Sequence, residues 1–334
     1  MRRWVILIAL LDCGVRGAEL GVNGAGQIEV RGSDLRVFRD GADAPLFGSV
    51  TRHENIVRFT PALPFAAGGA YRVEVETSKG AWSTHSLRIP ELGGGAPTVS
   101  MLVADTVYPA NALKFYLQFS QAMEQGVFLD RITLLRRDGR PVPGAFRETE
   151  LWSPDGRRLT LWLHPGRQKA GVNLNMDEGP VLVEGEMHML KIAASWRSAH
   201  GVELGKTFSF PIIAGATDHQ CPEPKLWRVI TPKRGTCDTL RIVFDEPLDP
   251  AMLRSAIQVR MGGLELQGAV DLPPDAKSWA FRPEDPWPSG EYEITIDPLL
   301  EDLAGNNLQH SFEVDREQTG NPKPVTTSLS FKVE

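Results

Sequence analysis

Apolar and polar residues alternate over short runs along most of this chain, and the alternation predicts β-strands. The runs Tyr71–Val75, Leu240–Phe244 and Tyr292–Ile296 place an apolar side chain at every second position. A period of two is typical of a strand with one face in a core and one face outside it. Asp-Gly pairs at 40–41, 138–139 and 155–156 supply the positive backbone dihedral that tight hairpins need. The pattern therefore predicts an all-β protein of short strands and tight turns.

One module recurs three times along the sequence. Strand-like runs end in an apolar residue, a spacer and a proline at 59–61, 163–165 and 281–283. A further glycine follows in each copy, at Gly80, Gly201 and Gly305. Each copy has six or seven predicted strands over about 70 to 120 residues, which is the spacing expected of a two-sheet sandwich. Length alone indicates about two domains, and the repeats raise the expectation to three.

The first residues have the pattern of an export signal. Met1–Arg3 is a positive segment and Trp4–Leu11 is an apolar segment too short to span a bilayer. We predict a signal peptide over residues 1–18. One alternative is a lipoprotein motif in which Cys13 is lipidated, although Asp12 stands where that motif prefers a small residue. The other is a buried N-terminal strand. Export favours a periplasmic, cell-surface or extracellular location, with a lipid anchor at Cys13 as the variant.

The two remaining cysteines suggest an oxidising compartment. Cys221 and Cys237 form an even pair once Cys13 is removed or lipidated, and they flank the strand-like segment 225–230. We predict a disulfide between them. Two free thiols, or a weak metal site with His219, are the alternatives, and the second lacks a further ligand cluster.

Composition and motifs exclude several function classes. The 334 residues carry a net charge of −6 and no basic stripe, which argues against a nucleic-acid partner. There is no Gly-x-Ser-x-Gly elbow and no His-Glu-x-x-His pair, and the seven histidines are scattered singly. We therefore expect no catalytic residues and no cofactor, and a protein or a glycan as the partner.

A loop insertion in the second copy is the candidate binding loop. Residues 166–179 have no counterpart in the last copy, and long loops at a sandwich end often carry recognition. We predict binding residues at Trp152, Arg167, Lys169 and Trp196. The alternatives are that the mixed charges only solvate the loop and that the tryptophans are buried. For Trp287 we expect burial at the end of the last sandwich.

Acidic residues near the last copy offer a second kind of site. The turn 245–249 (Asp-Glu-Pro-Leu-Asp) together with Asp302 could supply oxygen ligands to calcium. Aspartates are also common in turns because they bond to the backbone, so the turn itself is the alternative explanation. Two carboxylates about 5 to 10 Å apart in a groove would instead favour a carbohydrate-active enzyme.

The second and third copies resemble the bacterial Ig-like module of the SbsA (S-layer) type. The resemblance rests on a strand ending in Phe-Ser or Phe-Asp, a Phe-x-Pro corner, a Gly-x-Tyr strand and the hairpin 302–308 (Asp-Leu-Ala-Gly-Asn-Asn-Leu). It covers roughly residues 97–315. The whole chain also resembles exported bacterial Ig-like proteins of uncharacterised function that share the segments 151–161 and 165–167. These resemblances imply immunoglobulin-like sandwiches in an envelope or secreted protein, and they transfer no catalytic residues.

Together these observations predict tandem immunoglobulin-like β-sandwiches, three in number. After the signal peptide we expect an abbreviated domain over 19–92, a second over 96–213 and an SbsA-like third over 222–334. The predicted function is that of a non-enzymatic exported envelope or surface protein with structural or protein- and glycan-binding modules. An accessory or carbohydrate-active enzyme with an inter-domain cleft, or a calcium-stabilised adhesin, are the alternatives.

Overall fold

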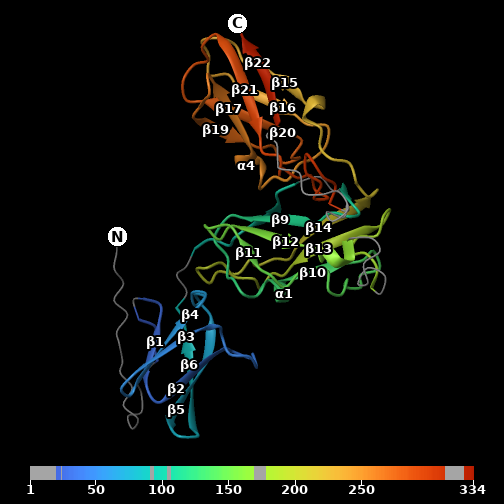
Figure 1. Cartoon of the computed structure of the whole chain (residues 1–334). Coiled ribbons are helices and arrows are strands. Elements are labelled where there is room, and N and C mark those ends of the chain that lie inside the picture. The colour runs from blue at the N-terminus through green and yellow to red at the C-terminus, as the bar shows by residue number, and fades with distance from the viewer. Residues whose placement is uncertain (1–19, 24, 91–93, 104–106, 169–177, 313–326) are drawn as a thin grey trace.

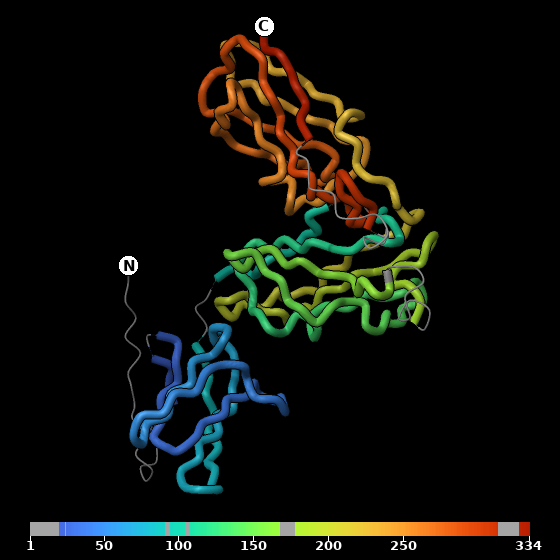
Figure 2. The backbone as a smooth tube through the Cα atoms, in the orientation of Figure 1, coloured from blue at the N-terminus to red at the C-terminus, as the bar shows by residue number. Residues whose placement is uncertain are grey.

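A computed structural model describes residues 20–334 apart from residue 24 and the segments 91–93, 104–106, 169–177 and 313–326. The predicted signal peptide and Cys13 lie outside the described residues. Three β-sandwiches follow one another in sequence order, from the blue body at one end to the red body at the other (Figures 1 and 2). The structure confirms the all-β, tandem-sandwich fold class. The described helices are short single turns, and none is long and apolar enough to cross a bilayer.

The first sandwich packs two three-stranded antiparallel sheets, ordered β1-β4-β3 and β2-β5-β6. Alternate residues of the strands point into a small core that includes Ile28, Val37 and Val73. The outer strands β3 and β6 remain largely exposed, because each has a neighbour on one side alone. The strand bounds are β1 (Ile28–Arg31), β2 (Asp34–Arg39), β3 (Gly48–His53), β4 (Ile56–Pro61), β5 (Ala70–Ser78) and β6 (Ala81–Arg88).

The second sandwich contains the largest core and two four-stranded sheets, ordered β11-β12-β9-β7 and β10-β13-β14-β8. Phe115, Leu161 and Trp196 are fully buried between the sheets. The elements are β7 (Val99–Met101), β8 (Val107–Pro109), β9 (Lys114–Phe119), α1 (Phe128–Arg131), β10 (Ile132–Leu135), β11 (Leu151–Trp152), β12 (Arg158–Trp162), α2 (Pro165–Gln168), β13 (Met187–Ile192) and β14 (Phe208–Gly215).

The third sandwich repeats this plan with sheets ordered β15-β16-β20-β19 and β18-β17-β21-β22. Trp287 is buried in its core, as predicted from the sequence. The elements are η1 (Pro224–Leu226), β15 (Arg228–Ile230), β16 (Leu240–Val243), α4 (Leu253–Ala256), β17 (Ile257–Met261), β18 (Leu264–Glu265), β19 (Gly268–Asp271), β20 (Ser278–Pro283), β21 (Gly290–Ile296) and β22 (Thr327–Val333).

Two of the three recurring glycines lie where one sandwich contacts the sandwich before it. Gly80, Gly201 and Gly305 have similar positive φ angles of 82°, 89° and 85°. A Cβ on Gly201 would lie 2.5 Å from the backbone oxygen of Ala67 in the first sandwich. A Cβ on Gly305 would collide with the side chain of Leu113 in the second sandwich. The hairpin at this position of the module therefore docks against the preceding module at both junctions.

Polar contacts secure the first of these two junctions. Arg197 Nη1 donates a 2.7 Å hydrogen bond to the carbonyl oxygen of Gly68. Arg39 Nη1 lies 3.0 Å from Glu124 Oε1, whose side chain is 8% exposed.

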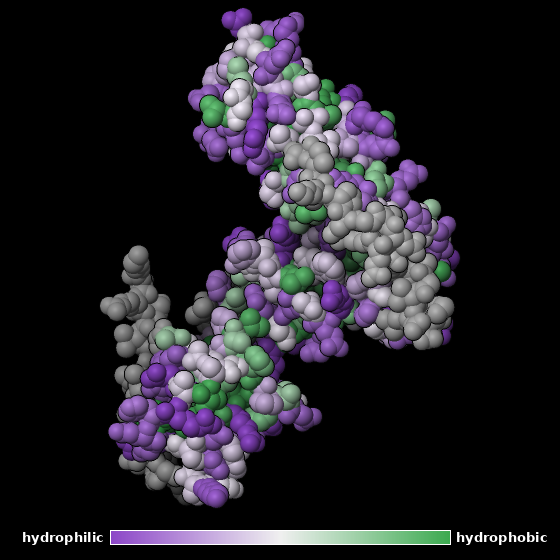
Figure 3. Space-filling view, in the orientation of Figure 1, coloured by the Kyte–Doolittle hydropathy of each residue, from purple (hydrophilic) through white to green (hydrophobic). Residues whose placement is uncertain are grey.

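The surface of the molecule is mainly hydrophilic on the face drawn in Figure 3, with apolar residues in small patches.

Replacing Gly201 with alanine is expected to loosen the junction between the first two sandwiches. The added Cβ cannot fit against the Ala67 carbonyl, and the positive φ is itself strained for alanine. Gly80→Ala is the matched control, because it shares the φ but has open space around it and should cost only about 1 kcal/mol. Limited proteolysis between the sandwiches should therefore be faster in Gly201→Ala than in Gly80→Ala. Equal rates for the two variants would contradict the docking role.

Candidate functional site

A buried ionic network joins the second and third sandwiches. Asp249 of the third sandwich is 1% exposed, and its Oδ2 atom accepts hydrogen bonds from Lys114 Nζ at 2.9 Å and from Tyr116 Oη at 2.7 Å. Lys114 Nζ also lies 2.7 Å from Glu301 Oε2. Lys114 and Tyr116 are on β9, on the face opposite the core residue Phe115. Tyr116 is nevertheless buried, because the third sandwich covers it.

The protonation states of this network follow from burial and from its charges. Burial alone would lower the pKa of Lys114, but the carboxylates of Asp249 and Glu301 reverse that effect and raise it. Burial, with the neighbouring Asp249 charge, raises the pKa of Tyr116 far above its usual range. Lys114 therefore stays charged, and Tyr116 stays a hydroxyl donor, at physiological pH.

Two asparagines fix the linker between these sandwiches at Asp218. The side chain of Asn111, in the second sandwich, accepts a 2.9 Å hydrogen bond from the Asp218 amide and donates a 2.7 Å bond to the Asp218 carbonyl. Asn306, in the third sandwich, donates to the same carbonyl at 3.2 Å. The main chain of Asp218 is thereby held by both neighbours, and its carboxylate is positioned at the junction.

A pocket of about 410 Å³ opens beside this linker. The second sandwich contributes the ends of β8 and β14, and the third contributes the acidic turn and the region before β20. Its lining residues are Val107, Pro109, Gly215, Ala216, Thr217, Asp218, Glu246, Pro247, Lys277 and Leu303. The pocket thus joins an apolar wall to two carboxylates and a lysine.

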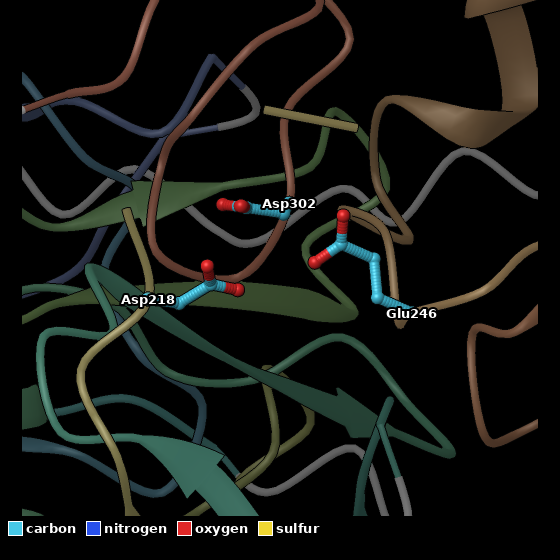
Figure 4. Close-up of side chains that lie close together, drawn as sticks. All are labelled: Asp218, Glu246 and Asp302. Carbon is cyan, nitrogen blue, oxygen red and sulfur yellow. The ribbon is translucent and has the colours of Figure 1, made fainter. Parts of the chain in front are cut away.

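Three carboxylates lie together at this junction, and we call them the junction carboxylates: Asp218 and Glu246, which line the pocket, and Asp302 beside them (Figure 4). One oxygen of each lies within 4.8 Å of the others. Asp302 is 2% exposed, and its oxygens accept bonds from the Ala304 and Asn306 amides and from the Asn306 side chain at 2.7–2.9 Å. The hairpin that docks against Leu113 therefore also positions Asp302.

The crowding of negative charge changes the acidity of two junction carboxylates. Burial, with the Asp302 and Asp218 charges nearby, raises the pKa of Glu246 to about 8. Burial raises the pKa of Asp302 to about 7, against the opposing effect of its hydrogen bonds from Asn306. The cluster consequently binds protons near neutral pH, as expected of carboxyls that share one site.

The cluster gives incomplete support to the calcium expectation. Of the acidic residues predicted from the sequence, it contains Glu246 and Asp302, whereas Asp249 is bound to Lys114. Asp302 uses both oxygens within its own turn, which leaves two carboxylates to face the pocket, and calcium takes six to eight oxygens.

Asp218 is the functional residue that sequence reasoning missed. It lies in the linker directly before His219, and no local sequence pattern pairs it with Glu246 or Asp302. Its proximity to both depends on the way that Asn111 and Asn306 clamp the linker. Its position in a linker between two predicted domains is the one sequence feature that indicates a role at the domain junction.

Two of the four predicted binding residues, Trp196 and Arg167, are buried. Trp196 is fully buried, donates from Nε1 to the Glu124 carbonyl at 3.0 Å and packs against Phe119 and Trp152. Arg167 is 1% exposed because its guanidinium binds the backbone carbonyls of residues 143, 178, 179 and 180 from inside the fold. Trp152 is half-buried beside Trp196, and Lys169 lies outside the described residues.

The predicted disulfide is also absent between the described cysteines, and both are free thiols. Cys221 precedes β15, whereas Cys237 follows it in the turn before β16, so the two cysteines flank opposite ends of that strand. Cys221 lies near the junction carboxylates. Burial, together with the charges of Asp302, Glu246 and Asp218, raises the pKa of its thiol.

Comparison with known proteins adds structural resemblances of low similarity. No protein-family model matches the chain, and no curated protein matches it in sequence. It is similar to the Escherichia coli alpha-2-macroglobulin domains MG0-NIE-MG1, with 13% identity, a TM-score of 0.25, and 61% of this chain and 67% of that chain covered. It is also similar to the Ig1-2 module of the Drosophila receptor protein tyrosine phosphatase DLAR, with 13% identity and a TM-score of 0.24. That match covers 65% of this chain and 95% of the other chain.

A surface-layer protein is also among the similar structures. Domains 4–9 of the surface layer protein SbsC match with 8% identity and a TM-score of 0.23. The match covers 91% of this chain and 39% of that chain. This chain therefore spans well under half the length of that structure.

Replacing Glu246 with glutamine is expected to change how stability depends on pH. A carboxyl with a raised pKa in the folded state favours folding fully below its unfolded pKa of about 4, and this contribution is lost as pH rises through the folded value of about 8. The wild type should therefore lose stability relative to Glu246→Gln as the pH rises from about 5 to 8, and the difference should level off above the folded value. Melting temperatures across this range test it. Parallel profiles for the two proteins would contradict the raised pKa.

Proposed function

We propose that this chain is a non-enzymatic exported protein of the cell envelope or surface. Its Ig-like modules serve as structural units that also bind a protein or a glycan. The observation that carries the proposal is the way in which successive sandwiches are docked. The Gly201 and Gly305 hairpins close against the preceding sandwich, and Lys114, Tyr116 and Asp249 lock the second junction.

Sandwiches docked in this way favour a structural or binding role over catalysis. A buried carboxylate that binds a lysine and a tyrosine joins the third sandwich to the second and gives these two modules a defined relative position. Asp249 binds Lys114 and Tyr116, and Asp302 accepts the hydrogen bonds of its own turn, so these two carboxylates serve the packing of the junction. Both features suit a spacer or binding protein.

The N-terminal sequence supports the exported location. Two arginines followed by eight apolar residues form the positive and apolar regions of a secretory signal. Cleavage after residue 17 or 18 would release the sandwiches as a soluble periplasmic or extracellular chain. Lipidation of Cys13 would anchor the same sandwiches to a membrane.

Export is tested by fractionating bacteria that express the full chain with a C-terminal epitope tag. We expect the chain outside the cytoplasm and shortened at its N-terminus, as measured by intact mass. A variant with Arg2→Glu and Arg3→Glu should accumulate in the cytoplasm at full length, because the positive region directs export. Arg137→Glu, at an exposed position of the second sandwich, is the charge control and should be exported normally.

A wild-type chain that stays in the cytoplasm at full length would contradict the proposal. A mass increase consistent with a lipid on Cys13, together with recovery in the membrane fraction, would select the anchored form.

A further inference from the structure

The outer face of one sheet in the second sandwich carries an exposed apolar row. Met187 on β13 pairs with Ile213 on β14, and Ile213 pairs with Val107 on β8. Their exposed fractions are 41%, 40% and 48%. The intervening residues of these strands, such as His188 and Ile212, point into the core. Since paired residues on adjacent strands lie on one face, these three side chains form a continuous apolar strip about 10 Å long.

The strip leads directly into the pocket at the domain junction. Val107 lines the pocket and is also the last member of the row. The next pair along the same face, Gly215 and Pro109, lines the pocket as well. The sheet face therefore runs into the pocket at Val107, and the third sandwich contributes Glu246 to the pocket lining.

Acidic residues lie at both ends of this surface. Glu184 and Glu186 are exposed beside Met187, and Asp218 and Glu246 line the pocket beyond Val107. Among the described lining residues of the pocket, Lys277 is the one cation. A ligand with apolar groups and a positive charge would match the surface better than a neutral or an acidic one.

We propose that the row Met187–Ile213–Val107 and the adjoining pocket bind an extended segment of a partner protein that presents apolar side chains followed by a lysine or an arginine. The apolar side chains pack along the row, and the cation enters the pocket between Asp218 and Glu246. This proposal deepens the proposed function and rests on it, because it gives the binding module its site and the chemistry of its partner.

The pocket gives the cation a further advantage over other groups. Asp218 and Glu246 repel each other when both are ionised, so a cation between them relieves that repulsion. Binding should then release a proton from Glu246, and affinity for a cationic segment should rise between pH 6 and 9. A purely apolar ligand would show no such dependence.

The proposal is tested with short fluorescein-labelled peptides in which valine and threonine alternate and the last residue is lysine, glutamine or glutamate. Fluorescence anisotropy measures their binding to the full chain in low salt. We expect the lysine peptide to bind, and the glutamate peptide to bind at least about tenfold more weakly. Raising the salt concentration should weaken the lysine peptide most.

Two variants place the interaction on the apolar row. Ile213→Lys should weaken the lysine peptide about tenfold or more, because it puts a charge in the middle of the row. Ser209→Lys is the matched control, since it adds the same charge on the same face of β14 but away from the row, and it should change affinity by less than about twofold. Melting temperatures close to wild type show that both variants are folded.

Several results would overturn the proposal. These are failure of every peptide to bind, equal affinity for the lysine and glutamate peptides, or unchanged binding by Ile213→Lys. Self-association of the chain that Ile213→Lys abolishes, without peptide binding, would assign the surface to a second copy instead. Export of Ile213→Lys is expected to be normal, so cell fractionation separates a failure of this site from a failure of the proposed function.

Discussion

The arrangement of the second and third sandwiches depends on one buried carboxylate. Asp249 is almost completely removed from solvent, and an ionised carboxylate in that position is unfavourable without hydrogen bonds and a counter-charge. Lys114 supplies the charge and Tyr116 supplies a second donor, both from the outer face of β9. Moving the third sandwich away would break the ion pair between Asp249 and Lys114. The position of the pocket and of the junction carboxylates follows from this constraint.

The repeated module also shapes both junctions. A glycine with positive φ lets the same hairpin approach the preceding sandwich at both junctions, where a side chain would collide. In the first sandwich the corresponding Gly80 has the same φ but no close neighbour. One local conformation is therefore kept in all three modules and used for docking in two of them. An array built in this way can be rigid even though each module has its own core.

Local sequence patterns predicted the elements of the fold well and the junction poorly. The alternation at 115–119, the proline corners and the hairpin glycines depend on neighbours along the chain, so the strands and turns could be predicted from them. Tyr116 looks like an ordinary outward position of a strand, and only the third sandwich makes it buried. Asp218 joins Glu246 and Asp302 through tertiary contacts that leave no spacing to detect. The disulfide prediction rested on the short sequence separation of Cys221 and Cys237, which lie on opposite sides of β15, whereas the burial of Trp196 depends on its packing against Phe119 and Trp152.

Hydrogen exchange at the amide of Leu113 tests the central claim most directly. This amide bonds to the Leu303 carbonyl across the junction at 3.0 Å, so its exchange reports opening between the two sandwiches. Residue-resolved exchange by NMR should show that Lys114→Met accelerates Leu113 by at least about tenfold, because the buried Asp249 charge loses its partner. The amide of Ile294, inside the third sandwich, should exchange as in the wild type. An unchanged rate at Leu113, or equal acceleration at both amides, would contradict the claim that this ion pair holds the sandwiches together.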